Sequence, residues 1–201
     1  MIFRLLLISF LFILPSVEPF FIPLKSTDRS DLSKISLTAI GKFGLLRKAR
    51  TTVPAHLHTG IDIKRPENNY NNEPIFAIAK GKVISKRSDG PYAQLIIEHE
   101  FNNTTIWTVY EHIAGIAINL NETVDPGKPI ARFMNKNELD RFGWQFDHFH
   151  FEILKVKPLS IKPDKLHPER QFNSYTLCCY NSEDLQKYYY EPLRFMKEHL
   201  P

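Results

Sequence analysis

The sequence predicts a mainly β protein built from antiparallel sheets, with short helices near its C-terminal end. Short runs rich in Val, Ile, Phe and Tyr recur between residues 74 and 153. Clusters of Gly, Pro and Asn separate these runs, and helical periodicity occurs only near the C-terminus. The chain has 201 residues, 43% of them hydrophobic, which is enough for one domain with its own core.

The first 22 residues are expected to be a signal peptide or an N-terminal anchor. Arg4 precedes the apolar run Leu5–Leu14, which is too short for a membrane-spanning helix of about 20 residues. We therefore expect an exported protein, periplasmic or extracellular, attached to a membrane only if the leader is retained. Residues 23–34 are polar and charged and are expected to form a connector, with the folded part beginning near Ile35.

Six expected strands follow the connector, and turn signals such as Asp89-Gly90-Pro91 and Asp125-Pro126-Gly127 separate them. The strands are expected at Pro74–Ala79, Lys82–Lys86, Gln94–His99, Thr105–Tyr110, Pro129–Phe133 and His148–Ile153.

Two helices are expected near the end of the chain. Ser182, followed by two acidic residues, is typical of a helix cap. Glu191-Pro192 is typical of a helix start, and Leu193, Met196 and Leu200 would then share one face. Cys178 and Cys179 are adjacent, so we expect small apolar fillers or, as the alternative, a strained vicinal disulfide.

The strand His148–Ile153 alternates polar and apolar residues. His148, His150 and Glu152 share one face, and the residues between them face the core. Taken alone, the two histidines could be an exposed polar edge. The flanking phenylalanines fix the register and favour two imidazoles held side by side.

A second histidine cluster precedes the strands. Pro54 and Gly60 oppose a helix here, and in an extended chain His58 and Asp62 share a face. Imidazole and carboxylate are both zinc ligands. His56 has the same parity as His58 and competes with it for this role, and a solvated loop is the alternative.

The two clusters together indicate a catalytic metal centre. His58, Asp62 and one later histidine provide three protein ligands, which leaves a fourth tetrahedral position for water. The remaining histidine is then free for proton transfer. His112, at the end of an expected strand, adds another imidazole, with a half-buried structural histidine as the alternative.

The order of these motifs resembles that of the LytM/lysostaphin-type zinc metallopeptidases, which cut peptide bonds in bacterial peptidoglycan. The resemblance extends from about residue 38 to 154 and depends on His58–Asp62, Ile75–Ala77, Gly81–Val83, Ile96–His99, Tyr110–Ile113, Val124–Ile130 and His148–Ile153.

The resemblance implies antiparallel sheets that form a groove with zinc at its floor. It makes His58, Asp62 and His150 the zinc ligands and His112 and His148 the catalytic histidines. We expect residues 35–157 to form the zinc metallopeptidase domain and residues 158–201, largely outside the resemblance, to form a C-terminal extension that packs on it. The implied function is a zinc endopeptidase that acts on peptidoglycan stem peptides or cross-links, with peptidoglycan peptides as partners and no nucleic acid.

Two segments depart from the family pattern. Asn135–Asp147, before the His-x-His, and Glu67–Glu73 are both longer than is usual, so they bear on substrate choice more than on activity.

Two alternative functions stay open. One is a non-catalytic module of the same fold that binds the wall or regulates a hydrolase, although such relatives typically lose ligands that this chain keeps. The other is a wall carboxypeptidase, which the short spacing from His58 to Asp62 opposes. The net charge of +4 suits an anionic wall without identifying a partner.

Overall fold

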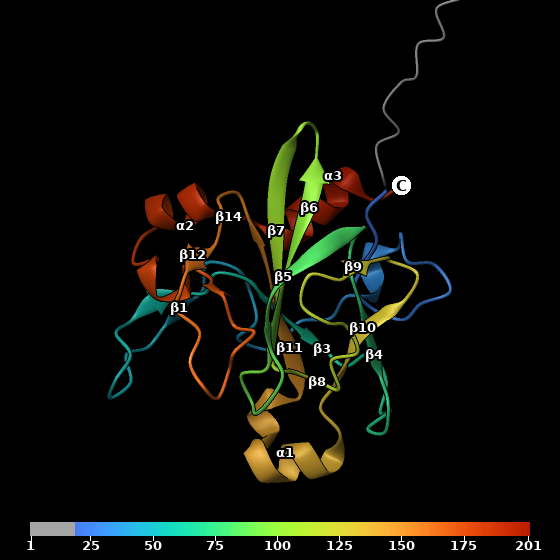
Figure 1. The fold of residues 1–201 in the computed structure, drawn as a ribbon, viewed down its shortest axis with the longest axis horizontal. Helices are drawn as coiled ribbons and strands as arrows, with labels where there is room; N and C mark the ends of the chain where they lie inside the picture. Colours follow the sequence, from blue (N-terminus) through green and yellow to red (C-terminus); the bar gives the residue numbers. More distant parts are fainter. Residues whose placement is uncertain (1–18) are drawn as a thin grey trace, which may run out of the picture.

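The structure is a computed structural model and describes residues 19–201. Its largest unit is an antiparallel sheet with the strand order β14-β11-β7-β6-β5-β9, in which β3 also pairs with β11 (Figure 1). These strands are β3 (Ile61–Lys64), β5 (Gly81–Arg87), β6 (Gln94–Phe101), β7 (Thr104–Glu111), β9 (Thr123–Val124), β11 (His148–Leu154) and β14 (Tyr189–Tyr190).

Three smaller antiparallel sheets complete the β structure within residues 19–201. The first joins β4 (Pro74–Phe76), β10 (Pro129–Phe133) and β8 (Ile113–Ala114). The second pairs β1 (Leu46–Arg47) with β2 (His56–Leu57), and the third pairs β12 (Leu159–Ser160) with β13 (Phe172–Asn173). The predicted mainly β fold is therefore confirmed, although β4 ends at Phe76 rather than Ala79.

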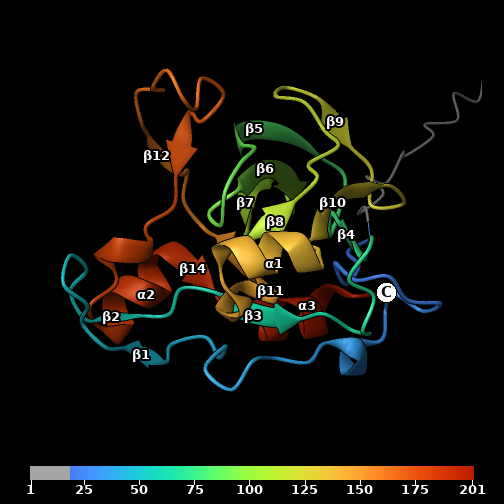
Figure 2. The same cartoon turned by 90° about the horizontal axis from the view of Figure 1, so that it is seen from below.

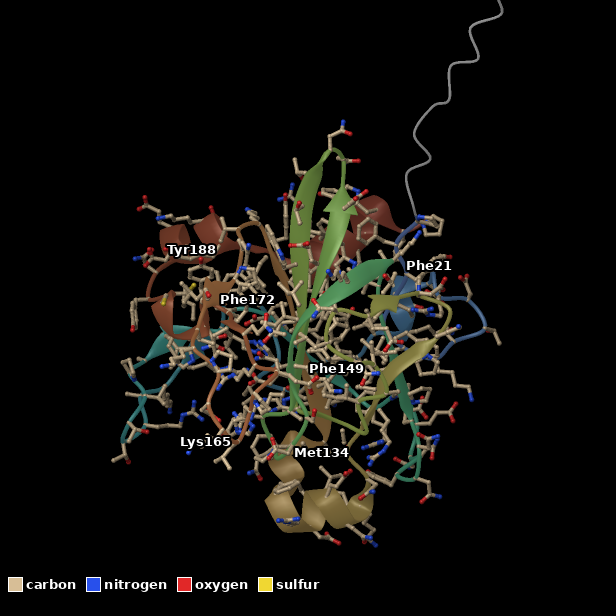
Figure 3. The ribbon with its side chains drawn as sticks, viewed as in Figure 1. Phe21, Met134, Phe149, Lys165, Phe172 and Tyr188 are labelled. Carbon is tan, nitrogen blue, oxygen red and sulfur yellow. The ribbon has the colours of Figure 1, made fainter. Side chains whose placement is uncertain are left out.

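The two faces of the central sheet are packed differently. Phe149, Phe151 and Ile153 of β11 point into the main hydrophobic core and are fully buried. The opposite face carries a second apolar cluster that includes Ile96, Trp107 and Val109. Residues of the C-terminal extension cover this second cluster, among them Phe172 and Tyr188, which are labelled in Figure 3.

The expected leader, residues 1–22, lies almost entirely outside the described residues. Its last residues are part of the fold: Phe20 and Ile22 are buried, and Phe20 packs edge-on against Phe195 at 5.3 Å between ring centroids. Leu24 is also buried and forms a β-bridge with Ile75. The core thus takes in residues before Ile35, because alternate apolar side chains at 20, 22 and 24 point into it.

The long segment before β11 contains a helix where the sequence analysis expected none. Helix α1 (Lys136–Phe142) and the 3-10 turn η2 (Trp144–Phe146) form an element in front of β11 and β8 in the view of Figure 2. Asn135 caps α1 in a capping box with Glu138, and Arg132 pairs with Glu138 at 2.6 Å. Only Leu139 of α1 is buried, so the helix has no apolar periodicity by which to predict it.

The two predicted C-terminal helices are present. Helix α2 (Ser182–Tyr188) is capped by Asn181 rather than by Ser182, and α3 (Pro192–His199) begins at the predicted proline. Short 3-10 turns occur at Leu32–Lys34 and Thr176–Cys178.

Two further features concern the cysteines and the helix lengths. Cys178 and Cys179 are free thiols, the first exposed and the second buried, so the vicinal disulfide is absent. None of the helices in residues 19–201 has the length and apolar character needed to span a membrane.

Candidate metal centre

Strand pairing brings the two histidine clusters together. In β11, His150 lies opposite Asp62 of β3 on one side and opposite Glu111 of β7 on the other. His58 precedes β3 and is held by two backbone hydrogen bonds, from Gly44 N to His58 O at 2.8 Å and from His58 N to Leu45 O at 2.9 Å. The site therefore depends on pairings between segments about 90 residues apart in the chain.

Three possible ligand atoms converge at this point. Oδ1 of Asp62 lies 3.0 Å from Nε2 of His58 and 3.0 Å from Nδ1 of His150. The two ring nitrogens are 2.9 Å apart. All three residues are buried, and together they could hold one metal ion. Two imidazoles and one carboxylate are a donor set that suits zinc.

The outer hydrogen bonds determine which nitrogen of each histidine faces the centre. Nδ1 of His58 donates to the carbonyl oxygen of Lys42 at 3.0 Å, and Nε2 of His150 donates to Oε1 of Glu152 at 3.0 Å. In the neutral rings, the two facing nitrogens are then both lone pairs. Two lone pairs and a carboxylate oxygen repel one another at 3 Å unless a cation lies among them, so the residues present fit a metal ion.

The electrostatics of the centre favour one positive charge. Burial lowers the pKa of His58. Burial also opposes the charge of His150, but Asp62 and Glu152 outweigh it and raise the pKa of His150 to about 10. Despite burial, the neighbouring histidines hold the pKa of Asp62 well below its usual range. This positive charge can come from a proton on His150 or from a metal ion that replaces the proton.

Two further histidines lie beside the centre. Nε2 of His148 is 3.7 Å from Oδ1 of Asp62, and the rings of His112 and His148 are 5.3 Å apart. Nδ1 of His112 donates to the carbonyl oxygen of Pro91 at 2.6 Å, which leaves its Nε2 free. Burial lowers the pKa of both rings, that of His112 to about 3, which favours the neutral imidazole over the charged form.

The backbone of His112 is held in an unusual conformation. Its φ of 62° lies in the left-handed region, which residues other than glycine rarely adopt. Such strained residues cluster at functional sites, because the surrounding structure must hold them in place.

A protein-family comparison agrees with this geometry. Residues 56–163, more than half of the chain, match the model of Peptidase family M23. The chain belongs to peptidase family M23. The predicted family is thereby confirmed, and the matched range includes all five histidine and aspartate residues of the centre and its flanks. No curated protein matches the chain.

Solved structures similar to this M23 chain include a zinc-containing peptidase from Vibrio cholerae, 25% identical with a TM-score of 0.48, which covers 68% of this chain and 37% of that one. A SpoIIIAH–SpoIIQ complex is 20% identical with a TM-score of 0.46, covering 67% and 90%. Csd3 of Helicobacter pylori is 15% identical with a TM-score of 0.41, covering 90% and 40%. This chain thus spans little more than a third of the length of the Vibrio peptidase.

Gly60 has a packing role in this M23 site. A Cβ at this position would lie 2.2 Å from the carbonyl oxygen of Phe151 and 2.9 Å from Cε1 of His150. Gly60 is not among the glycines with positive φ, so it is required by the close approach of β11 and not by a left-handed turn.

The M23 site also includes residues that the sequence analysis did not assign. Nη2 of Arg47, on β1, lies 2.7 Å from Oδ2 of Asp62. Thr59 and Thr176 both donate hydroxyl hydrogen bonds to Oε1 of Glu152, which in turn orients His150. No local sequence pattern predicts that Arg47 and Thr176 belong to the site, because their partners are distant in sequence. Thr59 adjoins His58 and could have been considered.

The remaining histidines of the M23 chain lie outside the centre. Nδ1 of His56 donates to the carbonyl oxygen of Pro54 at 2.9 Å, so His58, not His56, joins the cluster. His99 is buried and bonds to Lys80 and Thr108. His167 pairs with Asp89, and His199 packs against aromatic rings.

Proposed function

We propose that the chain is a zinc-dependent endopeptidase that hydrolyses peptide bonds in bacterial peptidoglycan stem peptides or cross-links. The observation that carries the proposal is the convergence of three possible ligand atoms of His58, Asp62 and His150, with His112 and His148 beside them. Membership of peptidase family M23 supports a peptidase.

In this mechanism, His58, Asp62 and His150 would hold the zinc ion. Zinc bound there supplies Lewis acidity that polarises a scissile carbonyl and makes water more acidic. His112 and His148 share proton transfer and stabilisation of the developing oxyanion. Nε2 of His112 is available for a proton because its Nδ1 is bonded to Pro91. Asp62 cannot also shuttle protons, because both of its oxygens have partners.

Substrate must approach over the less buried side of the centre. The side chains of His148 and Arg47 are 13% and 19% exposed, against 5–7% for those of His58, Asp62 and His150. An exported location would bring this side to its substrate, and the apolar run Leu5–Leu14 supports export.

The test combines metal analysis with digestion of purified peptidoglycan. The protein should contain about one zinc per chain. It should release peptide fragments that mass spectrometry identifies, and a chelator should abolish this release. His150→Ala should lose both metal and activity, whereas His148→Ala should keep metal and lose activity. His56→Ala is the matched control and should keep both.

Two results would contradict the proposal. Full turnover by His148→Ala would refute the assigned roles. If the purified protein holds no metal, does not respond to chelators and still binds cell wall, it is instead the non-catalytic module.

A further inference from the structure

A row of polar residues crosses the central sheet from the metal centre. Cross-strand pairing aligns His150 of β11 with Glu111 of β7, Glu111 with Gln94 of β6, and Gln94 with Arg87 of β5. Residues directly opposite one another in antiparallel strands lie on the same face. We name these four residues the polar row. It begins at a candidate metal ligand and ends at an arginine.

The polar row occupies one end of the sheet face that the C-terminal extension covers. Val109 and Ile96 lie two residues from Glu111 and Gln94 on the same face, and both belong to the covered apolar cluster. Within the row, Nε2 of Gln94 donates to Oε1 of Glu111 at 3.4 Å. The row is thus the part of this face that stays polar beside the metal centre.

Arg87, at the far end of the row, has no anionic partner. Within residues 19–201 it makes no hydrogen bond or ion pair through its side chain, and its buried Nε has no acceptor. The guanidinium group of Arg87 lies over the ring of Tyr92, at 5.8 Å from the guanidinium carbon to the ring centroid. A buried N–H group without an acceptor is unfavourable, and a ligand oxygen would satisfy it.

The C-terminal extension brings a second arginine to β5. Lys86 N donates to the carbonyl oxygen of Glu169 at 3.0 Å, so Arg170 follows a residue that is bonded to the neighbour of Arg87 in the chain. Ser85 Oγ accepts a hydrogen bond from Phe172 N at 3.1 Å, and Figures 2 and 3 show this part of the extension standing beside β5. Arg170 donates to Asn173 Oδ1 at 3.2 Å, but its buried Nε also has no acceptor.

Glu111 is the only acid of the polar row, and within residues 19–201 it forms no ion pair with Arg87 or Arg170. Its carboxylate accepts a hydrogen bond from Gln94 instead. In the part of the chain that the structure describes, neither guanidinium group therefore has an acidic partner.

We propose that Arg87 and Arg170 form an anion subsite that binds a carboxylate of the peptide substrate. This inference rests on the proposed function and deepens it, because it specifies an acidic peptide. Three interstrand steps of about 4.8 Å put Arg87 roughly 14 Å from His150. An extended peptide covers that distance in about four residues. The planar guanidinium group matches a carboxylate in two-point hydrogen bonding, which favours this anion.

The test compares two forms of one substrate, cross-linked stem peptides with free carboxylates and the same peptides with the carboxylates converted to carboxamides. The unmodified protein should cleave the acidic form with a kcat/KM roughly 10- to 100-fold higher. Arg87→Gln and Arg170→Gln should each reduce this preference and leave cleavage of the carboxamide form nearly unchanged. Arg194→Gln, at an exposed position of α3, is the control and should keep the preference.

Binding without turnover separates the subsite from the proposed function. Zinc-loaded His148→Ala should bind the acidic peptide more tightly than the carboxamide in calorimetry, and adding Arg87→Gln should reduce the difference. Equal affinity for the two forms would overturn the subsite, as would an equal loss of kcat/KM for both forms in Arg87→Gln. If no peptide is cleaved but the acidic form still binds preferentially, the proposed hydrolase fails and the subsite stands.

Discussion

Arg47 and Asp62 form an ion pair in which Nη2 of the arginine lies 2.7 Å from Oδ2 of the carboxylate. The other oxygen, Oδ1, faces His58 and His150. One oxygen of Asp62 therefore pairs with Arg47 and the other faces the two histidines. The ion pair with Arg47 orients the carboxylate toward the metal centre. Arg47 lies before residues 56–163, so this support comes from outside the matched M23 region.

Removal of this ion pair should weaken metal binding. We expect Arg47→Met to raise the zinc Kd by about 10- to 100-fold, the usual range for losing a group that orients a metal ligand. Arg47→Lys should restore part of the affinity, because it keeps the charge but not the planar fork. Competition with a chromophoric chelator measures the Kd. Arg50→Met, at an exposed position three residues further on, is the control, and an unchanged Kd in Arg47→Met would contradict the role.

Metal removal should lower thermal stability, because an ion that binds only the folded state stabilises it by mass action. Zinc at 100 times its Kd adds about 2.7 kcal/mol to the free energy of unfolding. We expect a chelator to lower the Tm of the protein and of His56→Ala, and to leave the Tm of His58→Ala unchanged. Differential scanning calorimetry with and without zinc makes the comparison. A zinc response in His58→Ala like that of His56→Ala would refute His58 as a ligand.

Gly60→Ala should damage both the fold and the metal centre. The added methyl group would collide with the backbone oxygen of Phe151 and press on the ring of His150. We expect a loss of about 1–3 kcal/mol in the free energy of unfolding, typical of overpacking, together with weaker zinc binding. Gly127→Ala is the control, since its methyl group would meet only a side-chain oxygen of Asp125 at 3.1 Å. Urea unfolding should separate the two variants, and equal stabilities would disprove the packing role.

His99 should make stability depend on pH. Burial lowers the pKa of His99 from 6.5 to about 4, despite its bond to the carbonyl oxygen of Lys80. Below pH 6.5 His99 binds a proton in the unfolded chain but not in the folded chain. The free energy of unfolding therefore falls as pH drops from about 6.5 to 4. The full loss is on the order of 3 kcal/mol. The unfolding free energy of His99→Gln should vary less over this window, and an identical pH profile would contradict the assignment.

Local patterns were sufficient for much of the fold. Period-two alternation with turn residues between runs predicted β5, β6, β7, β10 and β11, because strands alternate their side chains between two faces. Helix α1 escaped prediction because it is stabilised by a cap and an ion pair rather than by an apolar stripe. The burial of Phe20 was not predicted for a different reason: its partner Phe195 lies at the other end of the chain, on α3.

The sequence by itself determined which residue types could bind a metal and which of them share a strand face, because alternation is a local property of extended backbone. The meeting of His58 and Asp62 with His150 and the ion pair of Arg47 with Asp62 were decided only by the tertiary structure. The pairing of β3 with β11 and the docking of β1 bring these atoms within 3 Å. Contacts between segments so far apart in the chain depend on which strands pair, and local alternation specifies the faces of a strand but not its partner.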